Sequence, residues 1–154
     1  MRFRALGLAA LLLAGCREAA PVAPKPAATA KPASANVIDF GNGTSVLSRT
    51  GEFSLQFSPL MMIDFDWESL WSSPVGNPEQ TIVFALSAPA RVHEIALRGT
   101  QLEFAAPHSV ILDSSLDNQT WTPLVTVKPK ANADVQTFAF PPKGVRYIRL
   151  KTTS

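Results

Sequence analysis

From residue 36 onward, short apolar runs alternate with clusters of Pro, Gly, Asn and Ser. Thr81 to Leu86 is an unbroken run of the kind found in strands covered on both faces. Phe53, Leu55 and Phe57 alternate with polar residues, which predicts a strand with one exposed face. Helical periodicity is scarce, so the pattern predicts an all-β domain. The other predicted strands are Val92 to Leu97, Val110 to Leu112, Trp121 to Val127, Val135 to Phe140 and Val145 to Leu150.

Two turn-rich stretches organise the second half of this pattern. The sequence DSSLDNQ, residues 113 to 119, predicts a hairpin, and Pro141-Pro142-Lys143-Gly144 is expected to separate the last two strands. Strands of this length and spacing suit an antiparallel β-sandwich or jelly roll, in which binding residues sit on the connecting loops. Residues 36 to 154 are enough for one such domain and too few for two.

The first fifteen residues have the composition of a secretory signal. Two arginines precede the apolar run Ala5 to Ala14, which is too short to cross a bilayer. The run ends in Leu13-Ala14-Gly15-Cys16, which looks like the cleavage box of a bacterial lipoprotein. We therefore expect a signal peptide over 1–15 and a lipidated Cys16, whose acyl chains attach the protein to a membrane without crossing it. Cys16 is the only cysteine, which excludes a disulfide within the chain.

Residues 16–35 are predicted to be a disordered tether. The segment from Arg17 to Ala35 contains eight Ala and four Pro and has no large apolar side chain beyond Val22, so it cannot form a core. As an extended polyproline segment it reaches roughly 60 Å from the membrane surface. Arg17 follows the lipidated Cys where an Asp would retain a lipoprotein in the inner membrane, and this favours the outer membrane.

The charge balance excludes a nucleic-acid binder. Five of the 14 basic residues precede Asn36, which leaves nine against eleven acidic residues in the folded part. The net charge of this part is therefore −2, whereas the whole chain carries +2. A basic face of the kind that binds phosphates is missing from this composition.

Several short motifs follow one another in a characteristic order. They are Ile63-Asp64 with Ser69 and Trp71, Pro78-Glu79-Gln80 with Ile82 and Leu86, Val92 to Leu97, Val110 to Trp121 ending in DNQTW, and Arg146-Tyr147-Ile148-Arg149-Leu150. In this order they resemble the discoidin, or coagulation factor five/eight type C, domains, including family 32 carbohydrate-binding modules. The resemblance extends over residues 44 to 151 and implies a galactose-binding-like jelly roll that binds glycans or lipid head groups without catalysis.

The resemblance also implies a structural Ca²⁺ near residue 64. Asp64 and Ser69 fall on family positions whose oxygens join backbone carbonyls around the ion, and we take Asp64, Ser69 and Asp66 as the candidate ligands. Phe65 stands where members usually have Gly. The alternative is a solvated acidic turn held by backbone hydrogen bonds. Many members also return a Glu ligand from a later strand, and here we expect Val37 to Phe40 to compensate at the sheet edge or that edge to stay open.

Catalysis is not expected, and no nucleophile, phosphate or dinucleotide motif is recognisable. In an extended segment Asp64 and Asp66 would lie about 6.6 Å apart on one face, but the two carboxylates of a glycosidase normally flank the substrate from opposing walls. A small hydrolase that uses this pair is a third hypothesis, beside a glycan-binding module and a protein-binding scaffold.

The ligand contacts are expected in two loops. Trp67 has an aromatic face on which a sugar can stack, although a partly buried loop anchor is the alternative for it. Trp71 and Trp121 are assigned to the core. In the loop from Arg98 to His108, the side chains able to bond hydroxyl groups are Arg98, Gln101, Glu103 and His108, and an ordinary surface role is the alternative for each.

The sequence therefore predicts a membrane-anchored, non-catalytic module of the bacterial outer membrane that binds a glycan through end loops of a β-sandwich. A scaffolding lipoprotein that binds a partner protein is the alternative.

Overall fold

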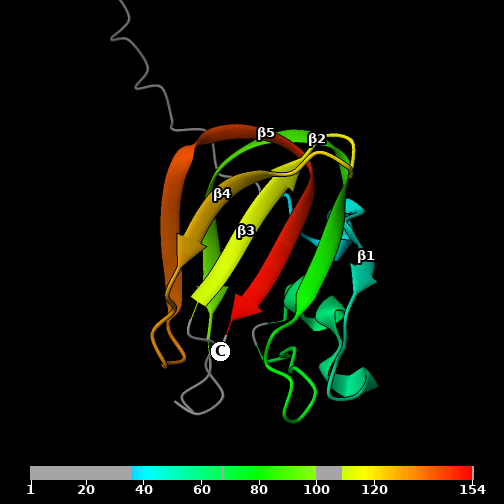
Figure 1. Ribbon diagram of the computed structural model, residues 1–154, viewed down its shortest axis with the longest axis vertical. Helices are drawn as coiled ribbons and strands as arrows, with labels where there is room; N and C mark the ends of the chain where they lie inside the picture. Colours follow the sequence, from blue (N-terminus) through cyan, green and yellow to red (C-terminus); the bar gives the residue numbers. More distant parts are fainter. Residues whose placement is uncertain (1–35, 67, 100–108, 154) are drawn as a thin grey trace, which may run out of the picture. The chain divides into compact units, whose positions relative to one another are not determined.

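The computed structural model describes residues 36–66, 68–99 and 109–153, where strands predominate (Figure 1). Every paired strand is antiparallel, and the order across the sheet is β1-β2-β5-β3-β4. None of the helices in these ranges is long and apolar enough to cross a membrane. The strands are β1 (Ser45–Arg49), β2 (Thr81–Arg98), β3 (Ser109–Ser115), β4 (Thr122–Val127) and β5 (Val135–Thr153), and the 3-10 helices are η1 (Phe40–Asn42), η2 (Leu55–Phe57) and η3 (Pro59–Met62).

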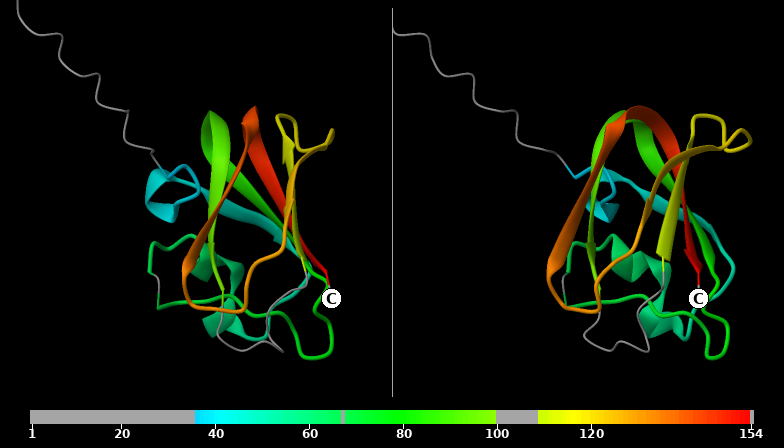
Figure 2. Two further views of the ribbon diagram at one scale, coloured as in Figure 1. Left: turned by 90° about the vertical axis from the view of Figure 1, so that its left-hand side faces the viewer. Right: turned by 60° about the vertical axis from the view of Figure 1, so that its left-hand side comes forward.

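The two longest strands, β2 and β5, bend together and fold the sheet into two layers (Figures 1 and 2). Residues 81–85 pair with 147–151, and residues 90–98 pair with 135–145. Between these two blocks, residues 86–89 of β2 lie opposite a single residue of β5, Arg146. A bulge of this kind bends a strand sharply. The antiparallel β-sandwich is therefore confirmed, although it consists of one hydrogen-bonded sheet that turns a corner.

The expected break at residues 141 to 144 is wrong, because Pro141 and Pro142 lie inside β5. The register shifts between Val92↔Lys143 and Glu94↔Ala139, so that residues 140–142 face one residue of β2. Neither proline needs to donate an N–H to a regular ladder at this bulge, and the fixed φ of proline suits an extended chain. The segments predicted as four strands are therefore two continuous ones.

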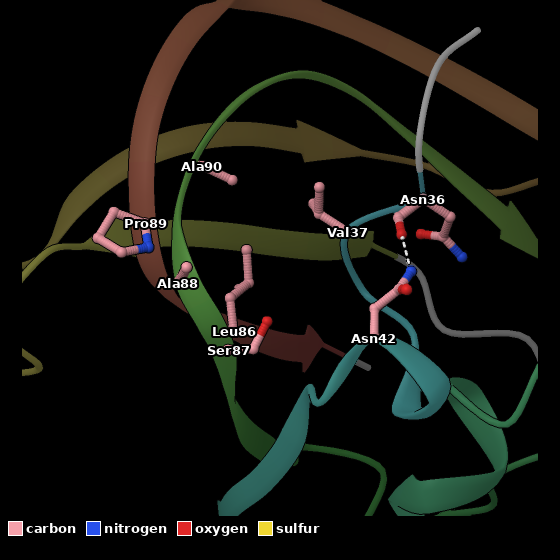
Figure 3. Close-up of a pocket in the computed structure, with 8 residues that line it drawn as sticks. All are labelled: Asn36, Val37, Asn42, Leu86, Ser87, Ala88, Pro89 and Ala90. Carbon is pink, nitrogen blue, oxygen red and sulfur yellow. Dashed lines mark hydrogen bonds between the residues drawn. The ribbon is translucent and has the colours of Figure 1, made fainter.

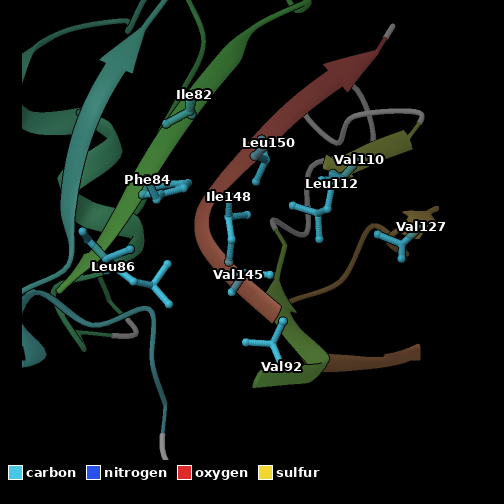
Figure 4. Packing of buried hydrophobic residues seen from close by; sticks show 11 residues of the cluster. Ile82, Phe84, Leu86, Val92, Val110, Leu112, Val127, Val145, Ile148 and Leu150 are labelled. Carbon is cyan, nitrogen blue, oxygen red and sulfur yellow. The ribbon is translucent and has the colours of Figure 1, made fainter. Parts of the chain in front are cut away.

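The core lies between the two layers (Figure 4). Ile82, Phe84 and Leu86 are at most 3% exposed, and they meet buried residues of β3 and β5 such as Leu112 and Ile148. Val83 is also buried, which confirms that the apolar run from residue 81 is covered on both faces. Burying one such side chain contributes about 1.5 to 3 kcal/mol to stability.

The strand expected over residues 53 to 57 is wrong. The segment forms η2, where Phe57 N donates to Ser54 O at 2.9 Å. Phe53 and Leu55 are 54% and 79% exposed, and the rings of Phe53 and Phe57 pack edge to face at 5.8 Å. A three-residue alternation is too short to distinguish a strand from a turn when local i to i+3 hydrogen bonds are available.

The predicted β3–β4 hairpin is confirmed, and its turn is held by one carboxylate. Asp117 Oδ1 accepts from the backbone N–H groups of Gln119 and Thr120 at 2.9 and 2.8 Å, and Ser115 Oγ also donates to it. These bonds, those from Gln119 and Thr120 first, hold the pKa of Asp117 far below its ordinary value. Asn118 takes the left-handed conformation with φ 61°, which Asn tolerates well.

The outer strands of the sheet are β1 and β4. In β1, the register shifts between Val46 and Ser48, which leaves Leu47 as a bulged residue. In β4, Pro123 occupies a position that suits an edge strand. The segment from Val37 to Phe40 does not form the compensating strand, because Val37 and Ile38 instead pack against the core ahead of η1. Phe40 N donates to Ile63 O at 2.8 Å and ties this segment to the loop after η3.

A buried ion cluster joins β3 to β5. Asp113, 5% exposed, accepts from Arg149 Nε and Nη2 at 2.9 and 2.7 Å, and Lys151 Nζ lies 2.8 Å from the same oxygen. Burial by itself raises the pKa of Asp113, but the hydrogen bonds and charges of Lys151 and Arg149 outweigh that effect and lower the pKa. The strongly basic late strand thus has a specific acidic partner.

Candidate functional site

The acidic loop after η3 is anchored at one end and exposed along the rest. Ile63 is 2% exposed and belongs to the core, whereas Asp64 and Asp66 are exposed. Asp64 Oδ1 accepts from Asp66 N at 3.0 Å, and Asp66 Oδ1 accepts from Glu68 N at 2.9 Å. Each aspartate therefore closes a turn two residues ahead, as Asx turns do.

Three oxygens converge in this loop around the Ser69 hydroxyl. Ser69 Oγ lies 2.9 Å from each of three acceptors: Met61 O, Asp64 Oδ1 and Asp66 O. A hydroxyl has one proton and can donate fully to only one of them. The other two contacts therefore bring oxygen lone pairs together, and a bound cation would relieve the repulsion between them.

The donor set fits a hard cation such as Ca²⁺, which takes six to eight oxygens and accepts backbone carbonyls and waters. Asp64 and Ser69 would contribute side-chain oxygens, and Asp66 would contribute its carbonyl oxygen, which lies 2.9 Å from Ser69 Oγ. In the described residues no cluster of three or more His, Cys, Asp or Glu could hold a metal ion. A site here would thus depend on carbonyls, and Ca²⁺ binding stays a prediction.

Phe65 is bent into the backbone conformation that glycine prefers. Its φ is 65°, in the left-handed region, and its side chain is 66% exposed. For an L-residue this conformation costs about 1 to 2 kcal/mol. Because the chain turns at Phe65, Asp64 and Asp66 do not lie on one face of an extended strand, which was the premise of the hydrolase hypothesis.

The second expected loop begins at the end of β2. Arg98 Nε donates to Ala133 O at 2.8 Å, which ties the strand end to the segment before β5. The Gln136 side chain of β5 bonds Lys130 N and O and Asn132 Oδ1 of that segment. The remaining candidates, Trp67, Gln101, Glu103, His108 and the lipidation residue Cys16, lie outside the described residues, so their roles stay predictions.

The two tryptophans assigned to the core differ. Trp71 is half-buried and packs against the core cluster, as expected. Its Nε1 is buried without a hydrogen-bond partner in the part of the chain that the structure describes. Trp121 is half-buried as well, but it is not among the residues that pack against the core cluster, and the guanidinium carbon of Arg149 lies 4.4 Å from its ring centroid. Its core assignment is wrong, because the cluster around Asp113 holds Arg149 over this ring.

Sequence reasoning missed two sets of residues. Asp113 was placed in the hairpin turn and Lys151 was assigned no role, whereas the structure puts Asp113 in β3, where it pairs with Arg149 of the late motif and with Lys151. The cavity between the start of the domain and the β2 bulge was also missed, because its walls come from residues about fifty positions apart. No periodicity within either segment signals that juxtaposition.

Comparison with known proteins identifies the fold. The profile of the F5/8 type C domain matches residues 42–154. No curated protein sequence matches the chain.

Three solved structures illustrate the likeness. CpGH89CBM32-5 from Clostridium perfringens, in complex with GalNAc-β-1,3-galactose, has a TM-score of 0.63 and 15% identity, covering 77% of this chain and 89% of that one. Chitosan-binding module 2 of a chitosanase/glucanase from Paenibacillus sp. IK-5, in complex with chitotriose, has a TM-score of 0.64 and 15% identity, covering 77% of this chain and 88% of that one. The family 32 carbohydrate-binding module of Streptococcus pneumoniae EndoD has a TM-score of 0.63 and 15% identity, covering 78% of this chain and 86% of that one. At these identities the likeness establishes the fold.

Proposed function

This chain belongs to the F5/8 type C domain family, and we propose that it is a non-catalytic carbohydrate-binding module anchored to a bacterial outer membrane. The observation that carries the proposal is the match to whole sugar-binding modules. The folded part covers 86 to 89% of three such modules, two of them solved with a bound glycan. Correspondence to whole sugar-binding modules supports recognition of a glycan rather than its turnover.

The proposed sugar site is formed by loops at the ends of the sandwich. Trp67 would stack on a sugar ring and Arg98 would bond a hydroxyl, with Gln101, Glu103 and His108 as further contacts. The Asx turns at Asp64 and Asp66 support this role, because they hold the flanks of position 67 in a defined geometry. A loop that is ordered before binding loses less entropy when the ligand arrives.

Calcium would act as a structural element of the same loop. Bound between Asp64, Ser69 and the carbonyls of Met61 and Asp66, it would fix the loop rather than take part in chemistry. Sugar affinity would then fall on chelation because the loop loses order.

Anchoring would depend on Cys16. Two or three acyl chains on its thiol and amine would give effectively stable attachment, with residues 17 to 35 as the spacer. Cys16→Ser in the full chain is expected to move the protein from the membrane fraction to the soluble fraction. A Cys16→Ser protein that stays in the membrane fraction after a carbonate wash would contradict lipid anchoring.

A glycan array with the full chain, run with Ca²⁺ and with a chelator, tests the sugar proposal. We expect a selective set of neutral glycans to bind, and Trp67→Ala to abolish binding while the circular dichroism spectrum is retained. Phe53→Ala is the matched control, because it removes an aromatic ring that is 54% exposed on η2's flank. The absence of any selective glycan would reject the proposal.

A second candidate function, a scaffold that docks a protein, is favoured by one observation. Nine of the eleven exposed large apolar side chains of the described residues lie between Phe40 and Val75. Exposed apolar surface of this kind is common at protein interfaces. In this case pull-down from envelope extracts recovers one protein in stoichiometric amount, and that recovery is lost on Leu55→Asp but not on Trp67→Ala. The nine residues are Phe40, Leu47, Phe53, Leu55, Leu60, Met62, Phe65, Leu70 and Val75.

A further inference from the structure

A cavity of about 250 Å³ lies where β2 turns the corner of the sandwich (Figure 3). One wall is the bulged part of β2, which includes Leu86, Ser87 and Ala90, and the other is the segment of Asn36, Val37 and Asn42 that leads into η1. Its lining does not include the acidic loop or Arg98. This corner pocket is therefore distinct from the site proposed above.

The wall from residue 36 to residue 44 is held in place by its own hydrogen bonds. Asn42 Nδ2 donates to Asn36 O at 2.8 Å, and Ile38 N donates to Asn36 Oδ1 at 3.2 Å. Thr44, 1% exposed, donates through Oγ1 to Val37 O at 2.8 Å. The pocket wall is thus organised before any ligand arrives, which lowers the entropy lost on binding.

The opposite wall is shaped by the β2 bulge. Residues 86–89 face Arg146 alone, so this stretch leaves the regular ladder and stands away from β5. At Gly43 (φ 79°) an added Cβ would lie 3.1 Å from Ser87 Cβ, so the segment that leads into β1 approaches Ser87 closely. Bulges often present backbone and side chains to a ligand.

The lining combines apolar surface with uncharged hydrogen-bonding groups. Val37, Leu86 and Ala90 supply aliphatic contacts, and no residue that lines the pocket carries a charge. Among the described residues Asn42 uses its Nδ2 and Asn36 its Oδ1, which leaves the Asn42 amide oxygen as an acceptor and the Asn36 amide nitrogen as a donor for a ligand. Within the described part of the chain the Ser87 hydroxyl has no partner either, and it can both donate and accept.

We propose that the corner pocket binds one uncharged sugar ring. A pyranose has C–H faces for the aliphatic wall and hydroxyl groups for the two amides and Ser87. A volume just below the usual 300 to 1,000 Å³ range for drug-sized ligands limits the occupant to about one ring. A carboxylate or ammonium group would lose hydration with no counter-charge in the lining. The proposal rests on the proposed function for its ligand class only.

The affinity of this pocket is weak, because the lining includes no aromatic ring on which the sugar could stack. A dissociation constant on the order of 1 mM is expected for a ligand of this size. The pocket would add avidity when a second sugar of the same glycan occupies the loop site.

Titration of the ¹⁵N-labelled full chain with galactose and with N-acetylgalactosamine, followed by amide chemical shifts, tests this. We expect saturable shifts at residues 36 to 42 and 86 to 90, and glucuronate to cause at least five-fold weaker effects. Ala88→Leu, at an exposed position of the lining, should fill the pocket and weaken binding there at least five-fold. Ser87→Ala should weaken it two- to five-fold.

Matched controls separate these effects from changes in the fold. Ala139→Leu and Ser48→Ala alter exposed residues of β5 and β1 and should leave the titration unchanged. Shifts confined to the acidic loop and the end of β2 would overturn the corner pocket and leave the proposed function standing. Shifts at the corner that Ala88→Leu does not weaken would also overturn it. If neither sugar nor any array glycan causes shifts anywhere, both proposals fail.

Discussion

Replacing Asp113 by Asn removes the negative charge that holds β3 to β5 and leaves the side-chain shape nearly unchanged. Three donor atoms of Arg149 and Lys151 lie 2.7 to 2.9 Å from one carboxylate oxygen. Hydrogen bonds to charged groups contribute about 1.5 to 3 kcal/mol each, but they are not additive. After the substitution the two cations stay side by side without their shared partner.

The magnitude depends on how well water can take the place of the carboxylate. Breaking a fully buried pair costs about 3 to 5 kcal/mol. Here the carboxylate is 7% exposed, whereas the side chains of Arg149 and Lys151 are 27% and 36% exposed and can rehydrate. We therefore expect Asp113→Asn to lower the free energy of unfolding by about 2 to 3 kcal/mol.

The effect should depend on pH in a defined direction. The pKa of Asp113 is lower in the folded protein than its value of about 3.9 in the unfolded chain. Its contribution to stability is therefore complete above the unfolded pKa and is lost as the pH falls through the folded pKa. The difference between the wild type and Asp113→Asn should be constant from pH 5 to 7 and shrink below about pH 4.

Urea unfolding followed by circular dichroism measures this difference, provided that the m-value stays constant. Asp134→Asn is the control, because Asp134 is exposed and accepts one hydrogen bond from Asn132. It should change stability by less than about 0.5 kcal/mol. An equally small change for Asp113→Asn, or a difference that widens as the pH falls from 5 to 2, would refute the reasoning.

Three further predictions concern the loops. Phe65→Gly should raise the free energy of unfolding, measured in urea, by about 1 kcal/mol, because the φ of residue 65 is 65°. Phe53→Gly, at a position where φ is not positive, should lower it. A lower free energy of unfolding for Phe65→Gly would contradict the strain argument. Ca²⁺ at ten times its Kd should stabilise the chelator-treated protein by about 1.4 kcal/mol in a melting assay. Ser69→Ala, which removes one proposed ligand, should abolish this stabilisation. A melting temperature insensitive to Ca²⁺ would reject the site. Gly51→Ala should lower the free energy of unfolding by about 1 to 3 kcal/mol, because the added Cβ would lie 2.7 Å from Pro74 Cγ. Gly144→Ala is the control, because a Cβ at that position meets open space. Equal losses of stability in the two variants would argue against the clash.

Features encoded by neighbouring residues were predictable from the sequence. The run from Thr81 to Leu86 is apolar without interruption, and it forms a strand buried on both faces. The turn at Asp117 and Asn118 depends on bonds between residues at most three positions apart, so its composition was sufficient to place the β3–β4 hairpin. Likewise Phe65 occupies a position where the family prefers Gly, and its φ is positive.

Features that depend on register between distant segments were not predictable. The segments on both sides of residues 86–89 form one strand, β2, because both pair with β5, some sixty positions later. The partner of Arg149 is Asp113, 36 positions away, and the same pairing keeps Trp121 out of the core. The Phe53 to Phe57 alternation failed for the opposite reason, because local turn bonds outweighed a weak pattern.

The bulge at Leu47 and the proline at position 123 have a consequence for how densely such modules can be displayed. Each interrupts the outermost strand on one side of the sheet, where a second molecule would otherwise find a straight row of N–H and C=O groups to extend. Copies crowded together on a surface would therefore lack a template for strand-by-strand polymerisation. Local crowding can then raise avidity for a multivalent ligand without seeding fibrils.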